Sequence, residues 1–197
     1  KSYLVKSSSL YSPNEPLDCG NSGTTIRLLT GLLAGQGIRA QLYGDDSLMK
    51  RPMGRIIEPL KKMGADLEVK NNKIVLKKST IQGGSIQNQT SSAQVKSSII
   101  LAGLGGRGKT SLIESYATRD HTERMLSFHS NNIINVKEKQ IEVTQDSFDA
   151  RDIDIPGDIS KASFLIACAC LAPESNLTIE NLLINPKRMG FTDTLKI

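Results

Sequence analysis

The chain has 197 residues, of which 38% are hydrophobic and 16 are Gly, so it suits one large domain, or one domain with part of a second, and is not disordered. Its longest apolar stretch, Phe164 to Ala172, is far below the roughly 18 residues that cross a bilayer, and its opening residues do not read as a signal peptide, so we expect a soluble, cytoplasmic protein. The net charge of +5 favours an anionic partner. Trp is absent and only 4% of residues are aromatic, so binding of single-stranded nucleic acid by base stacking is disfavoured. Small phosphorylated ligands fit better, and a solvated basic surface with no specific partner is the alternative.

The first predicted elements form a strand and two helices followed by a hairpin. Small polar residues 20–25 lead into the apolar helical run 26–35, and residues 40–44 have the pattern of a strand. A second helix is expected to open at Arg51-Pro52-Met53, because Pro suits the first helical position. Residues 67–76 alternate around Asn-Asn, which predicts a hairpin.

The same order of elements returns about 70 residues later. Residues 91–94 precede the apolar run 95–104, residues 110–114 read as a strand, and residues 135–143 read as a hairpin centred on Glu-Lys. The second helix of this copy is expected to open at Glu123-Arg124-Met125. The repeat predicts an α/β fold of βαβαββ units.

A third copy begins at residues 157–160 and stops after Lys187-Arg188-Met189 and a short helical segment, before any hairpin. Residues 1–18 resemble the tail of an earlier unit. We therefore expect a fragment that is open at both ends, and its three cysteines, Cys19, Cys168 and Cys170, are expected to be buried free thiols, since they fit neither a disulfide framework nor a zinc spacing.

The predicted helix starts are candidate anion sites. Free N–H groups and the helix dipole favour phosphate or carboxylate, Gly23 allows a close backbone approach, and Arg27 follows one turn later. Ser92, Gln94 and Lys96 lie at the start of the first helix in the second copy. The guanidinium of Arg51 can donate two parallel hydrogen bonds to a carboxylate or phosphate. The plain alternative is that these residues cap helices or are solvated.

Ionisable residues are also dense in the segment 118–125. Asp120 or Thr118 as a helix cap, with Glu123 completing a capping box, is the structural explanation, and His121 as an acid or base is the functional one. The sequence has no G-x-S-x-G elbow, Walker loop, H-E-x-x-H or paired Cys motif. We therefore expect no cofactor and no metal.

Several segments together resemble one family. GNSGTTIRLL, RPM, SSAQVKSSIILAGL, TRDHTERML, IPGDISKASF and NPKRMGFTDTLK are similar, in order and over nearly the whole chain, to the 3-phosphoshikimate 1-carboxyvinyltransferase (EPSP synthase) family. The resemblance implies a monomeric enzyme with a two-domain, inside-out α/β barrel-like fold of βαβαββ units. On that plan residues 1–150 are the later part of the first domain, namely the tail of one unit plus two units, and residues 151–197 begin the second.

The resemblance also implies an activity in chorismate and aromatic amino acid biosynthesis. The enolpyruvyl group of phosphoenolpyruvate would be transferred to the 5-hydroxyl of shikimate 3-phosphate with release of phosphate. It implies that Gly23, Arg51 and Gln94 bind phosphoenolpyruvate, and that shikimate 3-phosphate is bound by Ser92, Gln94, Thr118 and Arg119. The catalytic acid and base are not identified. The chain by itself is expected to be inactive.

Two other functions remain open. The related transferase that acts on UDP-N-acetylglucosamine shares the repeat, but it is expected to carry a reactive Cys on a Gly-rich loop, and Cys19 is not in that setting. A non-catalytic repeat protein that binds phosphates or other proteins through its helix starts is the second alternative.

Overall fold

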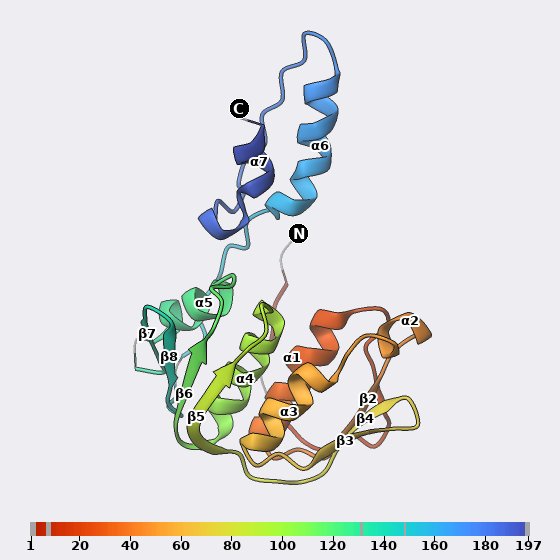
Figure 1. Ribbon diagram of the computed structural model, residues 1–197, viewed down its shortest axis with the longest axis vertical. Coiled ribbons are helices and arrows are strands. Elements are labelled where there is room, and N and C mark those ends of the chain that lie inside the picture. Colours follow the sequence, from red (N-terminus) through yellow and green to blue (C-terminus); the bar gives the residue numbers. More distant parts are fainter. Residues whose placement is uncertain (1–2, 7–8, 131, 148, 196–197) are drawn as a thin grey trace. The chain divides into compact units, whose positions relative to one another are not determined.

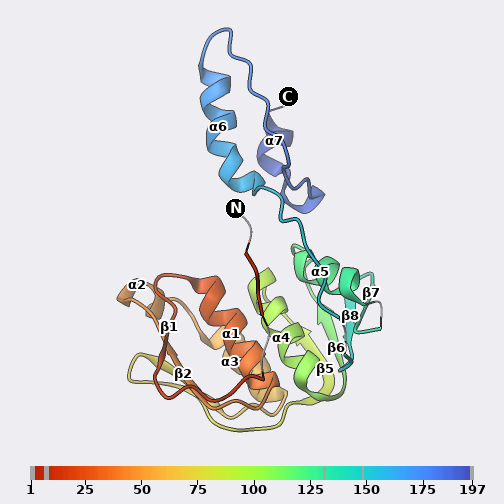
Figure 2. The same cartoon turned by 180° about the vertical axis from the view of Figure 1, so that it is seen from behind.

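The computed structural model describes residues 3–6, 9–130, 132–147 and 149–195, and its chain divides into two units, residues 1–149 and 150–197. Two four-stranded sheets, A and B, form the first unit (Figures 1 and 2). Sheet A and its helices comprise β1 (Leu17–Asp18), α1 (Gly23–Gly35), β2 (Ala40–Tyr43), α2 (Asp46–Met49), α3 (Gly54–Lys62), β3 (Leu67–Lys70) and β4 (Lys73–Leu76). Sheet B and its helices comprise β5 (Gln82–Asn88), α4 (Ala93–Gly105), β6 (Arg107–Glu114), α5 (His121–His129), β7 (Ile134–Lys137) and β8 (Gln140–Val143).

The two sheets have the same topology. Their strand orders are β1-β2-β4-β3 and β5-β6-β8-β7. In each sheet the first two strands are parallel and the remaining pairs are antiparallel. Asn71 and Asn72 both have positive φ, 49° and 59°, as a two-residue type I′ hairpin requires. The predicted α/β fold of βαβαββ units is confirmed.

Some boundaries differ from the sequence prediction. Leu17 and Asp18 pair with β2, so they open the first unit and do not close an earlier one. The short helix α2 was not expected, and Arg51 follows it in a loop, three residues before α3. Arg124 lies inside α5, so Arg119, which stands just before that helix, is the better counterpart of Arg51.

Helices α1 and α4 touch almost backbone to backbone. A Cβ atom at Gly31 would lie 2.2 Å from the Ser98 carbonyl oxygen, and one at Gly105 would lie 2.5 Å from the Gly35 carbonyl carbon. Figure 1 shows α1, α3 and α4 side by side, with the strands of sheet A to one side and those of sheet B to the other. Fully buried residues such as Ile26, Ile99 and Ile100 fill the core around this contact.

The second unit contains the start of a further repeat. It comprises α6 (Ile159–Leu171), the 3-10 helix η1 (Pro186–Arg188), α7 (Gly190–Thr194) and one parallel bridge between Gly157 and Leu182. Phe164 on α6 is 75% exposed and Leu171 is 85% exposed. Among the described residues no helix is long and apolar enough to span a membrane.

The cysteine prediction is correct for one residue and wrong for two. Cys19 is buried beside β1, whereas Cys168 and Cys170 are exposed on α6. Cys168 and Cys170 are exposed because, within the described part of the second unit, only short segments pack against α6. Burial raises the pKa of the Cys19 thiol, and the negative charge of Asp18 raises it further.

Replacing Gly31 with Ala should destabilise the first unit. The new methyl group would meet the Ser98 backbone, and overpacking of this kind costs about 1–3 kcal/mol. Urea unfolding followed by circular dichroism measures the change. The matched control is Gly54→Ala, because a Cβ there meets nothing within 4 Å. Equal unfolding midpoints for the two variants would contradict the close contact.

The three thiols should react with a disulfide reagent in two phases. Cys168 and Cys170 should react rapidly, and Cys19 slowly, because it is buried and its raised pKa lowers the fraction of reactive thiolate. Denaturant should release the third thiol. A Cys19→Ser variant should lose only the slow phase, and protection of Cys168 and Cys170 would show that α6 is covered.

Candidate functional site

The start of α1 is capped so that its first residue faces two arginines. Ser22 accepts a hydrogen bond from the Thr25 N–H (3.1 Å), which confirms the capping role of the small polar segment. A Cβ at Gly23 would lie 3.0 Å from Arg51 Nη1 and 3.3 Å from Arg27 Nη1. A Cβ atom at Gly23 would therefore press on both guanidinium groups, which would have to shift by a few tenths of an ångström.

Arg51 is held by an amide and not directly by a carboxylate. Its Nη2 donates to Asn21 Oδ1 (2.6 Å), and Asn21 Nδ2 donates to Asp45 Oδ2 (2.6 Å). Asp45 also caps α2 by accepting from the Leu48 N–H. The hydrogen bonds from Asn21 and Leu48, and then the charge of Arg51, hold the Asp45 pKa below its usual value. Because a neutral amide separates Arg51 from Asp45, its guanidinium remains available to an anion.

Gln94 joins the second repeat to the first. Arg27 Nη1 donates to Gln94 Oε1, and Gln94 Nε2 donates to Thr24 Oγ1 (2.7 Å). These bonds cross between α4 and α1, whose residues are 67 and 70 positions apart in the two pairs. The family resemblance assigned Gly23, Arg51 and Gln94 to one ligand. Arg51 and Arg27 both lie at Gly23, and Gln94 is bonded to Arg27 and Thr24, so the structure brings the three together.

The cluster carries excess positive charge. Burial lowers the Arg27 pKa, and the charges of Arg55 and Arg51 lower it further. Arg27 Nε is buried and has no hydrogen-bond partner among the residues that the structure describes. Two guanidinium groups, Arg27 and Arg51, beside a helix N-terminus, with the charge of Arg55 adding to the repulsion on Arg27, form an environment that an oxyanion would stabilise.

A second group of predicted residues lies around the start of α4 and the loop before α5. Ser92 caps α4 through the Val95 N–H (3.4 Å). The Thr118 side chain is buried, and its hydroxyl donates to Glu114 Oε1 (2.7 Å). Arg119 is half-buried and, among the described residues, has no hydrogen bond or ion pair. Its guanidinium is therefore available to a ligand.

The expected capping box before α5 is wrong. Asp120 stands at the N-cap position, but its carboxylate pairs with Arg124 at 3.1 Å. Glu123 Oε1 lies 2.6 Å from the ammonium of Lys96. His121 begins α5, and its role as an acid or base stays a hypothesis. The buried partner explains the failure, because an ion pair to Lys96 competes with the capping bond for the same carboxylate.

The same arrangement of an arginine and a helix start recurs in the second unit. Asp158 caps α6 by accepting from the Ser160 N–H (2.9 Å), and Arg188 Nη2 lies 3.1 Å from Asp158 Oδ1. The separation from Asp158 to Arg188 is 30 residues, the same as that from Asn21 to Arg51. Each of these two repeats thus ties an arginine to the start of its own first helix.

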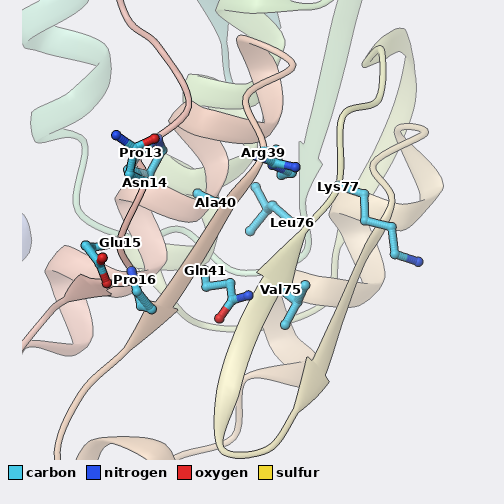
Figure 3. A pocket seen from close by; sticks show the side chains of 10 residues that line it. All are labelled: Pro13, Asn14, Glu15, Pro16, Arg39, Ala40, Gln41, Val75, Leu76 and Lys77. Atoms are coloured by element: carbon cyan, nitrogen blue, oxygen red, sulfur yellow. The ribbon is translucent and has the colours of Figure 1, made fainter.

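A separate hollow of about 230 Å³ lies on sheet A (Figure 3). Residues 13–16 form one side of it, with Val75 and Lys77 on the other, and Arg39 and Gln41 also line it. None of its lining residues belongs to the arginine cluster. Among the described residues, no group of three or more His, Cys, Asp or Glu side chains is arranged to hold a metal ion.

Sequence reasoning missed part of the cluster. Arg27 lies four residues after Gly23 on one helix face, and this spacing made it a candidate anion contact, but the family resemblance did not assign it to a substrate. Asn21 and Asp45 are 24 residues apart and meet only through the fold. Their pairing has no local signal in the sequence.

Comparisons with known proteins agree over the whole chain. The family model for EPSP synthase (3-phosphoshikimate 1-carboxyvinyltransferase) matches residues 1–197. The 3-phosphoshikimate 1-carboxyvinyltransferase of Ruthia magnifica subsp. Calyptogena magnifica is 45% identical over 99% of this chain and 46% of its own length. That of Thermodesulfovibrio yellowstonii is 46% identical over 100% of this chain and 47% of its own length.

A solved structure extends the likeness to three dimensions. EPSP synthase from Acinetobacter baumannii matches with a TM-score of 0.82 and 37% identity, over 94% of this chain and 43% of that one. The chain thus spans less than half the length of these relatives. With the repeated sheets and the arginine cluster at the helix start, these matches show that the chain belongs to the EPSP synthase family.

Proposed function

We propose that the protein containing this chain transfers the enolpyruvyl group of phosphoenolpyruvate to the 5-hydroxyl of shikimate 3-phosphate and releases phosphate. One observation carries the proposal: Arg27 and Arg51 lie over Gly23 at the start of α1, and Gln94 reaches Arg27 from the next repeat. Family membership supports the same activity, in chorismate and aromatic amino acid biosynthesis.

The charge of the cluster suits phosphoenolpyruvate. This ligand presents a phosphate and a carboxylate, and guanidinium groups bind both with paired, charge-assisted hydrogen bonds. The N–H groups at the start of α1 would add donors on the same side. We assign Gly23, Arg51 and Gln94 to phosphoenolpyruvate, with Arg27 as a further contact.

Shikimate 3-phosphate is assigned to the neighbouring group. Ser92 and Gln94 open α4, and Arg119 offers a guanidinium that has no partner among the described residues. The Thr118 hydroxyl already donates to Glu114, so its contribution is to fix the segment that carries Arg119. Gln94 then stands between the two substrates.

The proposed chemistry uses these cations to stabilise charge. Protonation of the phosphoenolpyruvate methylene gives a methyl group beside a carbocation-like centre, and the 5-hydroxyl attacks that centre and loses its proton to a base. Phosphate then leaves from the tetrahedral intermediate while the methyl group loses a proton, which restores the double bond of the enolpyruvyl product. Cations around phosphate and carboxylate hold the ligand and neutralise the departing phosphate. The acid and base for these three proton transfers are not assigned to any residue of this chain.

The domain assignment is part of the proposal. Residues 1–150 would supply the later part of the first transferase domain, and residues 151–197 the start of the second. The division of the chain after Asp149 and the Asp158–Arg188 pair at the start of α6 support it. We further propose a cytoplasmic monomer that acts on soluble metabolites and needs no nucleic acid, membrane or cofactor.

A phosphate-release assay on the product of the complete reading frame that contains this chain tests the function. Release should require both phosphoenolpyruvate and shikimate 3-phosphate. Arg51→Ala should raise the KM for phosphoenolpyruvate about 10- to 100-fold, because a charge-assisted hydrogen bond contributes about 1.5–3 kcal/mol. Arg39→Ala removes the same charge at the hollow on sheet A and should change this KM less than about twofold.

Three results would contradict the proposal. Equal effects of the Arg51 and Arg39 substitutions would show that the arginine cluster does not bind phosphoenolpyruvate. Release that depends on UDP-N-acetylglucosamine in place of shikimate 3-phosphate would favour the related transferase. A folded protein with no saturable binding of either substrate would favour a non-catalytic repeat protein.

A further inference from the structure

A buried ionic group lies behind the second set of predicted substrate contacts. We call Lys96, Glu114, Thr118 and Glu123 the Lys96 cluster. The side chain of Lys96 is 0% exposed, and its Nζ lies 2.6 Å from Glu123 Oε1 and 3.1 Å from Glu114 Oε2. The same ammonium donates to the Thr118 carbonyl oxygen (3.5 Å), and the Thr118 hydroxyl donates to Glu114.

The cluster joins four parts of the second repeat. Lys96 is on α4, Glu114 ends β6, Thr118 lies in the loop between β6 and α5, and Glu123 is in the first turn of α5. A further bond, between the hydroxyls of Ser97 and Thr122 (2.6 Å), ties α4 to α5 beside it. The loop is therefore attached to α4 at its start, near its middle and just beyond its end.

The fold itself does not require an ammonium at this position. The first repeat has Ile26 four residues after its helix cap Ser22, where the second has Lys96 four residues after Ser92. Both side chains are fully buried. Since an apolar residue fills the equivalent place, and since burying charges costs desolvation energy, stability is a poor explanation for Lys96 and its two carboxylates.

The position of the cluster offers a better explanation. Arg119 directly follows Thr118, and its guanidinium has no partner within the described part of the chain. Lys96 follows Gln94 by two residues on α4, and Gln94 is bonded to Arg27 and Thr24 of the first repeat. One helix thus fixes the loop that carries Arg119 relative to the residues assigned to both substrates.

We propose that Lys96 is a positioning residue for shikimate 3-phosphate: through Glu114, Thr118 and Glu123 it holds Arg119 at a set distance from Ser92 and Gln94. This inference rests on the proposed function. It requires that the cluster affects the phosphorylated sugar-acid substrate more than it affects phosphoenolpyruvate, because Gly23 and Arg51 lie in the first repeat and Gln94, which is assigned to both substrates, is held by Arg27 and Thr24 of that repeat.

The test is a charge-neutral variant of the product of the complete reading frame, with Lys96→Met, Glu114→Gln and Glu123→Gln combined. Similar shapes are kept while the ions are removed, so the protein should fold. The KM for shikimate 3-phosphate should rise about tenfold or more, because a small misplacement of a binding group has effects of up to about 100-fold. The KM for phosphoenolpyruvate should change less than about twofold, since its guanidinium contacts are untouched.

The matched control is the combination of Lys109→Met and Glu142→Gln. This ion pair (2.8 Å) lies on the same sheet, and its Lys109 side chain is 54% exposed. Both KM values should stay at the wild-type level in the control. An unchanged KM for shikimate 3-phosphate in the folded triple variant, or an equal rise for both substrates, would overturn the inference.

A second variant covers the case in which the triple variant fails to fold, as judged by circular dichroism. Glu123→Gln alone leaves Lys96 and Glu114 as a balanced pair, so burial of charge is not worsened. A selective rise of about threefold in the KM for shikimate 3-phosphate supports positioning by the cluster, and no rise refutes it. A wild-type protein without activity would instead refute the proposed function.

Discussion

The contact between α1 and α4 is the constraint on which the rest of the structure depends. Glycine at positions 31, 35 and 105 lets the two helix backbones approach, because a Cβ atom at any of them would meet the partner backbone within 2.6 Å. This approach brings the start of α4 within hydrogen-bonding reach of the start of α1. The candidate site is consequently built from two sequence repeats and not from one.

Charge is distributed around this contact in two ways. On the solvent side, Arg27 and Arg51 lie beside the N-terminus of α1, Arg27 is repelled by the charges of Arg51 and Arg55, and Asn21 stands between Arg51 and Asp45. On the inner side, Lys96 is surrounded by two carboxylates. The first arrangement leaves positive charge for a ligand, whereas the second satisfies it inside the protein. Helix α4 contributes to both arrangements, because Gln94 contacts Arg27 and Thr24 whereas Lys96 contacts Glu114 and Glu123.

Much of the fold could be predicted from the sequence because its signals are local. The apolar runs and the Asn-Asn turn are each read within a short window, and the repeat near 70 residues is found by comparing such windows; the structure confirms all three. The failures concern partners that are distant in sequence. Glu123 was taken for a cap because Lys96 is 27 residues away, and Cys168 was taken as buried because an apolar helix was assumed to be covered. Within the candidate site, Gly23, Arg51 and Gln94 were assigned by family resemblance, while Asn21 and Asp45 have no local signal.

The central claim is that side chains from two repeats act on one doubly anionic ligand. A double-mutant cycle with Arg51→Ala and Gln94→Ala measures it, with kcat/KM for phosphoenolpyruvate taken from the phosphate-release assay at saturating shikimate 3-phosphate. Residues that share a ligand couple by about 0.5–3 kcal/mol. The free-energy effect of the double variant should therefore differ by that amount from the sum of the two single effects. Effects that add to within about 0.3 kcal/mol would mean that the two side chains do not share a ligand, and would contradict a single site.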